Sequence, residues 1–187
     1  MDENHQKNRI VILDRDGVIN EDSVDYIKNP DEWIPIDGSL EAIALLHHHG
    51  YRVYIATNQA GIARGKLTES QLLDIHKKLL QQVSRAGGKV SGIHYCPHHP
   101  DDNCPYRKPS PGMLNKIGSE SGVEFADRDV DVAFVGDSLK DLQAAEAAGC
   151  RPVLVLTGNG RTTSAEAPHL IHVFSNLLAF AKNEITL

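Results

Sequence analysis

Two carboxylates lie two residues apart directly after a short apolar run near the N-terminus. The run covers residues 10–13, and the acids belong to the tetrad Asp14-Arg15-Asp16-Gly17. An ionised carboxylate can attack phosphorus and form an aspartyl-phosphate. A second carboxyl group can give a proton to the leaving oxygen and later accept one from water. Asp14, which is closest to the rigid strand, suits the nucleophile, and Asp16 suits the acid and base.

A second apolar run, residues 132–135, is followed by another acid, Asp137, with Asp141 just beyond. The carboxyl ends of parallel strands can converge on one crevice, so Asp14, Asp16 and Asp137 are expected to lie together. Three acids in one crevice repel each other unless a cation lies among them. The sequence therefore predicts a hard divalent ion with oxygen ligands, Mg²⁺, and a phosphate, which is the usual partner of such an ion.

Two further segments carry groups that suit a phosphate. Thr57, Asn58 and Gln59 follow a third apolar run, where a hydroxyl and backbone N–H groups can hold phosphoryl oxygens. The alternative for this segment is a capping loop before a helix. Lys108 supplies a point charge that can neutralise a phosphate and an attacking carboxylate, and Arg107 offers a planar fork for a second phosphate or a sugar hydroxyl.

Composition and charge exclude several classes of function. The chain has 187 residues, 41% of them hydrophobic and 24% charged, which is ordinary for a globular protein and long enough for a proper core. The net charge of −6 argues against a nucleic-acid partner. No apolar stretch approaches the ~20 residues of a membrane span, and residues 1–9 lack the apolar core of a signal peptide. We expect a cytoplasmic monomer.

Strand-like apolar runs alternate with amphipathic, helix-like runs along the chain. The pattern predicts strands at 10–13, 52–56, 90–95, 132–135 and 153–156, with a candidate sixth at 170–174, and helices at 39–49, 68–86, 110–121, 138–148 and 175–183. Ser39 and Thr68 suit helix N-caps, and Gly50 and Gly149 suit C-caps. This alternation predicts an α/β fold, a doubly wound parallel sheet with helices on both faces. We expect one domain over residues 1–187 with no separate cap domain.

The acids, the hydroxyl and the lysine resemble a known family in their order. Asp14-X-Asp16, Thr57, Lys108 and Gly136-Asp137 follow the order of the four motifs of the haloacid dehalogenase-like phosphatases, and the resemblance covers about residues 10 to 180. Longer segments resemble one branch, the heptose-1,7-bisphosphate 7-phosphatases: residues 14–20, residues 57–65, Cys96-Pro97-His98 and Arg107-Lys108-Pro109. The sibling branch, the histidinol-phosphate phosphatases, shares part of this pattern and remains the alternative.

The resemblance implies a Rossmann-like fold and a role for each matching residue. Asp14 would be the nucleophile and Asp16 the general acid and base, while Thr57 and Lys108 would hold the transferring phosphoryl group. Mg²⁺ would be held by Asp14, the carbonyl of Asp16 and Asp137. The substrate-binding residues would be Asp22, Ser23, Val24, Asp25, Asn58, Gln59, Arg107 and Ser138. The heptose enzymes often have a lysine where this chain has Ser138.

The loop at 96–106 contains the spacing of a small metal site. Cys96, His98 and Cys104 suit three ligands of a tetrahedral zinc ion that would close a loop with no core of its own. Relatives commonly have a fourth cysteine where this chain has Tyr106. The fourth position would then go to His99, to water or to nothing, and the alternative is a metal-free loop held by its prolines. Any zinc here would be structural.

Three functions follow from these observations. The resemblance implies a Mg²⁺-dependent phosphatase that releases the C7 phosphate of a heptose bisphosphate, a step toward the heptose of lipopolysaccharide. The second hypothesis keeps the chemistry and changes the substrate to histidinol phosphate. The third is a phosphate-binding regulatory module without turnover, which the replacement of Asp14 or Asp16 would favour; both acids are present.

Overall fold

The computed structural model describes residues 9–125, 130–167 and 172–186 of the chain. Within these ranges it contains one sheet of six parallel strands in the order β3-β2-β1-β4-β5-β6. The strands are β1 (Ile10–Leu13), β2 (Arg52–Asn58), β3 (Gly92–Cys96), β4 (Val132–Gly136), β5 (Arg151–Val155) and β6 (Val173–Phe174). This order is that of a doubly wound sheet.

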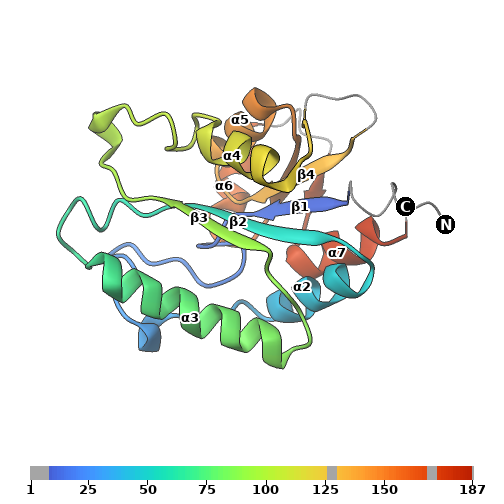
Figure 1. Cartoon of the computed structure of the whole chain (residues 1–187), viewed down its shortest axis with the longest axis horizontal. Helices are drawn as coiled ribbons and strands as arrows, with labels where there is room; N and C mark the ends of the chain where they lie inside the picture. The colour runs from blue at the N-terminus through green and yellow to red at the C-terminus, as the bar shows by residue number, and fades with distance from the viewer. Residues whose placement is uncertain (1–8, 126–129, 168–171, 187) are drawn as a thin grey trace.

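Helices cover both faces of the sheet (Figure 1). One layer contains α2 (Ser39–His48), α3 (Glu69–Arg85) and α7 (Leu177–Glu184), and the opposite layer contains α4 (Gly112–Ser121) and α5 (Leu139–Ala148). The short helix α6 (Gly160–Glu166) follows β5, and two 3-10 turns, η1 (Pro30–Glu32) and η2 (Pro100–Asp102), lie in the long loops.

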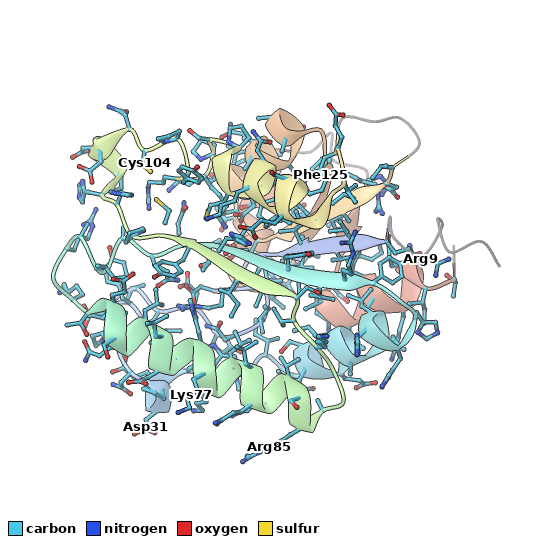
Figure 2. The ribbon with its side chains drawn as sticks, in the orientation of Figure 1. Arg9, Asp31, Lys77, Arg85, Cys104 and Phe125 are labelled. Carbon is cyan, nitrogen blue, oxygen red and sulfur yellow. The ribbon has the colours of Figure 1, made fainter. Side chains whose placement is uncertain are left out.

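The core consists of two apolar clusters, one on each face of the sheet. Val11 and Leu13 of β1 belong to the cluster that includes α2, α3 and α7, whereas Ile10 and Ile12 belong to the cluster that includes α4 and α5. All four side chains are fully buried, as expected for a central strand covered on both faces. Side chains fill the space between the sheet and both helical layers (Figure 2).

The strand order places the functional loops. The chain first builds β1, β2 and β3 toward one edge and then returns to place β4 on the other side of β1. The sequence of strands therefore reverses direction between β1 and β4, and ligands of such sheets bind outside the carboxyl ends of the strands at that point. The segments after β1 and β4 contain Asp14 and Asp137.

The predicted α/β doubly wound fold is confirmed, with differences at the ends of elements. Gly38, in the left-handed region, takes the N-cap position of α2 that was predicted for Ser39, whose hydroxyl instead donates to the carbonyl of Ile19. Strand β3 begins at Gly92 and not at residue 90. Residues 170 and 171 of the candidate sixth strand lie outside the described residues, and β6 covers only Val173–Phe174.

The structure contains one helix, α6, that was not predicted. The predicted N-cap of α3 is confirmed, because the Thr68 side chain accepts a hydrogen bond from the backbone N–H of Gln71. The single domain over residues 1–187 and the polar segment 1–9 include residues outside the described ranges, so both stay predictions. None of the described helices is long and apolar enough to cross a membrane.

Candidate active site

Asp14 is the first residue after β1, and its backbone continues the hydrogen bonding between β1 and β4. Its N–H donates to the carbonyl of Val135 in β4 at 2.9 Å. Its Oδ1 accepts a hydrogen bond from the N–H of Arg15 at 2.7 Å and lies 2.9 Å from Nζ of Lys108. In the described part of the chain no hydrogen bond reaches Oδ2. The side chain is therefore fixed through one oxygen and free at the other.

Lys108 is the cation of this site. Its side chain is buried, and Nζ lies 2.9 Å from Asp14 Oδ1 and 2.6 Å from Asp141 Oδ1 and donates to the carbonyl of Ala56 at 2.9 Å. Burial opposes the charge, but Asp14 and Asp141 outweigh it and raise the pKa of Lys108. The amine is thus a fixed positive charge between two carboxylates.

Asp14, Asp137 and Asp141 form a compact acidic cluster, with one carboxylate oxygen of each within 4.8 Å of the others. Burial raises the pKa of Asp14 well above its usual value, Asp141 and Asp137 raise it further, and Lys108 opposes them. Burial also raises the pKa of Asp137 to about 6. Three buried acids with one lysine lack positive charge, and this donor set fits a divalent cation with oxygen ligands.

The side chain of Asp16 does not join this cluster. Its carboxylate accepts hydrogen bonds from Arg15, from Nδ2 of Asn20 at 2.9 Å and from Nε2 of Gln59 at 2.9 Å. Burial opposes ionisation, but Arg15 and these hydrogen bonds outweigh it and lower the pKa of Asp16. Asp16 therefore lies near Asp14 in sequence as an oriented carboxylate outside the acidic cluster.

The last two residues of β2 and the residue after it belong to the site. Thr57 is buried, and its Oγ1 accepts a hydrogen bond from Nε2 of Gln59 at 3.0 Å. Asn58 pairs with the backbone of Lys108 in both directions: Nδ2 donates to the carbonyl at 3.0 Å, and Oδ1 accepts from the N–H at 3.1 Å. Asn58 thereby ties the loop that carries Lys108 to the end of β2.

Two glycines allow the loops after β1 and β5 to approach Asp137. Gly17 has φ +80°, and a Cβ there would lie 2.1 Å from Oδ2 of Asp137; Gly158 has φ +53°, with a corresponding distance of 2.2 Å. The same oxygen accepts from the N–H of Asn159 at 2.7 Å and from its Nδ2 at 3.2 Å. These close contacts exclude side chains at both glycine positions.

The predicted residues surround one cleft of 520 Å³. All four predicted catalytic residues and Asp137 line it, together with Asp22, Ser23, Val24, Asn58, Gln59, Arg107 and Ser138. Asp25 does not line the cleft; its carboxylate pairs with Lys28 and Lys66 on the surface. The hydroxyl and N–H of Ser138 both donate to Asp141 Oδ2 and close the first turn of α5.

Four residues of this region had been given no role from the sequence. Asp141 is fully buried in the acidic cluster, and its position three residues after Ser138, in a capping pattern, was the available signal. Asn159, from the loop after β5, and Arg15 are placed by tertiary contacts that the spacing of residues does not reveal. Lys140 of α5 is exposed and lines the cleft, two residues beyond Ser138.

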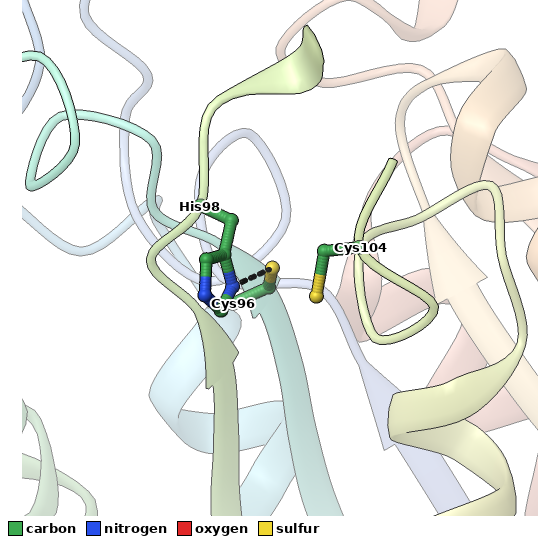
Figure 3. A group of neighbouring side chains, drawn as sticks. All are labelled: Cys96, His98 and Cys104. Carbon is green, nitrogen blue, oxygen red and sulfur yellow. Dashed lines mark hydrogen bonds between the residues drawn. The ribbon is translucent and has the colours of Figure 1, made fainter. Parts of the chain in front are cut away.

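The 96–106 loop brings three predicted zinc ligands together (Figure 3). The ligand atoms of Cys96, His98 and Cys104 lie within 4.8 Å of one another, and Cys96 Sγ is 3.6 Å from His98 Nδ1. Tyr106 is 47% exposed. His99, an alternative fourth ligand, has its Nδ1 beside Asp101 at 3.3 Å. The loop thus offers three donors of the type that zinc prefers, and His99 is not among them.

Known proteins resemble this chain over almost its whole length. Residues 105–179 match the family described as HAD-hydrolase-like. The D-glycero-beta-D-manno-heptose-1,7-bisphosphate 7-phosphatase of Pseudomonas aeruginosa is 52% identical over 92% of this chain and 95% of its own length. The enzyme of that name from Neisseria meningitidis serogroup A is 46% identical over 93% of each chain. The crystal structure of D,D-heptose 1,7-bisphosphate phosphatase from B. bronchiseptica, complexed with magnesium and phosphate, has a TM-score of 0.90 and 47% identity, covering 95% of this chain and 98% of that one.

Proposed function

We propose a function from this premise: the chain belongs to the haloacid dehalogenase-like hydrolases and, within them, to the family of its D-glycero-beta-D-manno-heptose-1,7-bisphosphate 7-phosphatase relatives. It is a phosphoric monoester hydrolase that removes the phosphate at C7 of this sugar bisphosphate and leaves the phosphate at C1. The observation that carries the proposal is Asp14, a buried carboxylate with one oxygen held by Lys108 and the other without a hydrogen bond among the described residues, in a cleft lined by further acids.

Asp14 is the proposed nucleophile. Its free Oδ2 attacks the phosphorus at C7, the bond to the sugar oxygen breaks, and an aspartyl-phosphate forms. Lys108, 2.9 Å from Oδ1, keeps Asp14 in its attacking orientation and offsets negative charge on the phosphoryl oxygens. Thr57, near the end of β2, lines the same cleft, and its hydroxyl is a proposed donor to those oxygens.

Asp16 is the proposed general acid and base. In its protonated form it gives a proton to the departing sugar oxygen, and the resulting carboxylate takes one from the water that hydrolyses the aspartyl-phosphate, which regenerates the acid. Its side chain lines the same cleft as Asp14 and is 23% exposed, so it can reach a bound substrate.

The acidic cluster fits Mg²⁺, which the B. bronchiseptica relative contains together with phosphate. Asp14 and Asp137 would hold the ion with the carbonyl of Asp16, and Asp141 completes the cluster while it pairs with Lys108. When bound, the ion supplies charge neutralisation among the acids and the phosphoryl oxygens.

The second phosphate of the substrate needs positive charge away from the acids. Lys108 is already paired with Asp14 and Asp141. Arg107 and Lys140 line the cleft at its surface, and we assign the C1 phosphate to them. Ser138 is committed to capping α5, so Lys140 is the cation that the start of this helix provides.

The loop beside Arg107 is the proposed zinc site. Cys96, His98 and Cys104 would hold a structural ion that fixes the path of the chain into Arg107, whose Nη1 donates to the carbonyl of His98 at 3.3 Å. Action as a monomer in the cytoplasm stays a prediction from the sequence.

The decisive experiment is phosphate release by the purified protein from three substrates: both C1 anomers of heptose bisphosphate, and histidinol phosphate. We expect the beta anomer to have the highest kcat/KM, as the names of the relatives indicate. A higher value for histidinol phosphate would replace the sugar substrate. The absence of phosphate release from all three would instead support a binding module without turnover.

A further inference from the structure

Arg15 is a buried cation beside the nucleophile to which the proposed mechanism gives no role. Its side chain is only 1% exposed, and it lies between Asp14 and Asp16 in the sequence. A guanidinium is rarely buried unless its donors are matched by acceptors, because removing the charge from water is costly. Its partners therefore show what it does.

One side of the Arg15 guanidinium forms a fork on Asp16. Nε donates to Oδ1 at 2.9 Å, and Nη2 donates to Oδ1 at 2.8 Å and to Oδ2 at 2.9 Å. A planar fork of this kind fixes the plane of a carboxylate, which the point charge of a lysine cannot do. Asn20 and Gln59 each add one hydrogen bond, but only Arg15 contacts both oxygens.

The other side of the guanidinium is braced by helix α3. Nη1 lies 3.3 Å from Nε2 of His76, and because Nη1 can only donate, Nε2 is the acceptor. His76 is buried, and its ring meets the ring of Tyr95 of β3 edge to face with centroids 5.8 Å apart. The helix layer thus holds the imidazole, and the imidazole fixes the end of the guanidinium that does not contact Asp16.

We propose that Arg15, braced by His76, is a positioning residue that sets the orientation of the Asp16 carboxyl for proton transfer to the departing sugar oxygen. The inference rests on the proposed function, in which Asp16 is the acid. Asp16 lies on a loop and is partly exposed, so its own backbone does not fix its rotamer. Proton transfer requires hydrogen-bond geometry, and an error of about 1 Å in such a group can reduce a rate about a hundredfold.

The test compares two substrates that differ in their need for a proton. A sugar alkoxide leaves only when protonated, whereas p-nitrophenolate leaves readily without a proton. In this mechanism kcat/KM reports the steps through departure of the leaving group. For Arg15→Lys we expect kcat/KM on heptose bisphosphate to fall about a hundredfold and that on p-nitrophenyl phosphate to fall less than about tenfold. An equal loss on both substrates would mean that Arg15 is only structural and would overturn the proposal.

Two further variants separate this inference from the proposed function. Asp16→Asn should show the same bias against the sugar substrate, and its absence there would refute the acid role of Asp16. A bias in Asp16→Asn without one in Arg15→Lys would refute only the role of Arg15. The matched control is Arg151→Lys, because Arg151 forms a comparable fork on Asp131 at the start of β5, at the opposite end of the strands from the site. A leaving-group bias in this control would invalidate the readout and remove the support for the proposal.

His76→Leu keeps the test valid if the Arg15 variants fail to fold. This change removes the acceptor for Nη1 and leaves the fork on Asp16 in place. We expect a bias in the same direction as in Arg15→Lys but smaller. A folded His76→Leu variant that loses no activity, or loses it equally on both substrates, would show that α3 does not brace Arg15.

Discussion

The two carboxylates of the Asp14-Arg15-Asp16 segment have opposite surroundings, although they are two residues apart. Asp14 lies among Asp137 and Asp141, and burial with these like charges raises its pKa. Asp16 is opposed by burial too, but the donors of Arg15, Asn20 and Gln59 lower its pKa. In the metal-free protein these directions are the reverse of what an ionised nucleophile and a protonated acid need, so the proposed mechanism requires a cation beside Asp14 to favour its ionised form.

The first prediction concerns the nucleophile. Asp14→Asn keeps the shape of the side chain but cannot form an aspartyl-phosphate, so we expect kcat to fall by about 10⁴-fold or more. The metal-free variant should unfold at a temperature no lower than wild type, because one of three crowded acids has lost its charge. Phosphate release and thermal denaturation in EDTA check both points. Retention of more than about a tenth of the wild-type rate would exclude Asp14 as nucleophile.

The second prediction tests the close approach at Gly17. Gly17→Ala strains a residue at φ +80° and places a Cβ 2.1 Å from the Asp137 carboxylate, so it should displace Asp137 and greatly reduce activity. The matched control is Gly122→Ala, where φ is +69° but no atom lies within 4 Å of the new Cβ. The control should lose about 1 kcal/mol of stability and keep its activity. Equal effects of both changes on kcat would mean that contact with Asp137 has no role.

At the scale of elements, the sequence predicted what periodicity and strand ends encode. The strands that precede Asp14 and Asp137 were both predicted, because a parallel strand that is buried on both faces has a continuous run of apolar residues. Helix α6 was missed because its seven residues, which include one glycine, two threonines and a serine, have low helix propensity and no clear apolar face. Its helical form depends on tertiary contacts such as Thr163 Oγ1 donating to the carbonyl of Asp137.

The site was predictable to the same degree and for the same reason. Residues at strand ends, such as Asp14 and Thr57, could be predicted to lie together because the sheet brings the carboxyl ends of its strands to one edge. Asn159 and His76 could not, since each reaches the site from an element whose position depends on packing of the whole fold. The direction of the Asp16 side chain could not be predicted either, because the local sequence does not show which hydrogen-bond donors a carboxylate on a loop will contact.

The third prediction concerns the loop that contains η2. Three ligands with Tyr106 exposed should hold zinc more weakly than four, so Tyr106→Cys should raise both zinc content and the unfolding temperature. The measurement is metal content by mass spectrometry on protein purified without chelator. Cys104→Ser should lose the metal. Stoichiometric zinc in Cys104→Ser, or substoichiometric zinc in both wild type and Tyr106→Cys, would exclude this ligand set.

The fourth prediction concerns helix α3 and pH. Burial, with Arg15 nearby, lowers the pKa of His76 to about 3, whereas an unfolded histidine titrates near 6.5. The unfolded chain therefore binds a proton that the native protein does not, and the stability that neutral His76 contributes is present above pH 6.5 and is lost as pH falls toward 3. Between pH 7 and pH 5 this amounts to about 2 kcal/mol.

His76→Gln, which keeps an acceptor for Arg15, should remove this part of the pH dependence. Chemical denaturation at pH 7 and pH 5 gives the measurement, with His48→Gln at the exposed end of α2 as the control. A difference in unfolding free energy between wild type and His76→Gln that is the same at both pH values would contradict the assignment.

At the scale of the whole molecule, charge distribution matters more than net charge. The chain carries a formal charge of −6, yet its proposed substrate carries two phosphates. Attraction must therefore come from local cations, and Arg107, Lys108 and Lys140 all line the cleft. The sheet order places the acidic cluster between β1 and β4 and leaves these cations on loops and the start of α5 around it.

The fifth prediction is that Mg²⁺ stabilises the whole protein in a pH-dependent way. Metal-free, Asp14 and Asp137 have raised pKa values, about 6 for Asp137. Both carboxyl groups bind a proton more tightly in the folded protein than in the unfolded chain. The stability that this proton binding contributes is therefore present at low pH and is lost as pH rises through these pKa values. Mg²⁺ replaces the proton as the neutralising cation, and at about 100 times its dissociation constant it should add about 3 kcal/mol.

Thermal denaturation in EDTA and in saturating Mg²⁺ tests this linkage. The shift in unfolding temperature should be large at pH 7.5 and small at pH 5, where protons compete for the same carboxylates. Asp137→Asn should abolish most of the shift, whereas Asp25→Asn, which alters a carboxylate outside the cleft, should keep it. Ca²⁺ should also stabilise the protein but not support turnover, because it prefers more ligands at longer distances. An equal unfolding temperature in EDTA and Mg²⁺ at pH 7.5 would show that the acidic cluster does not bind the ion.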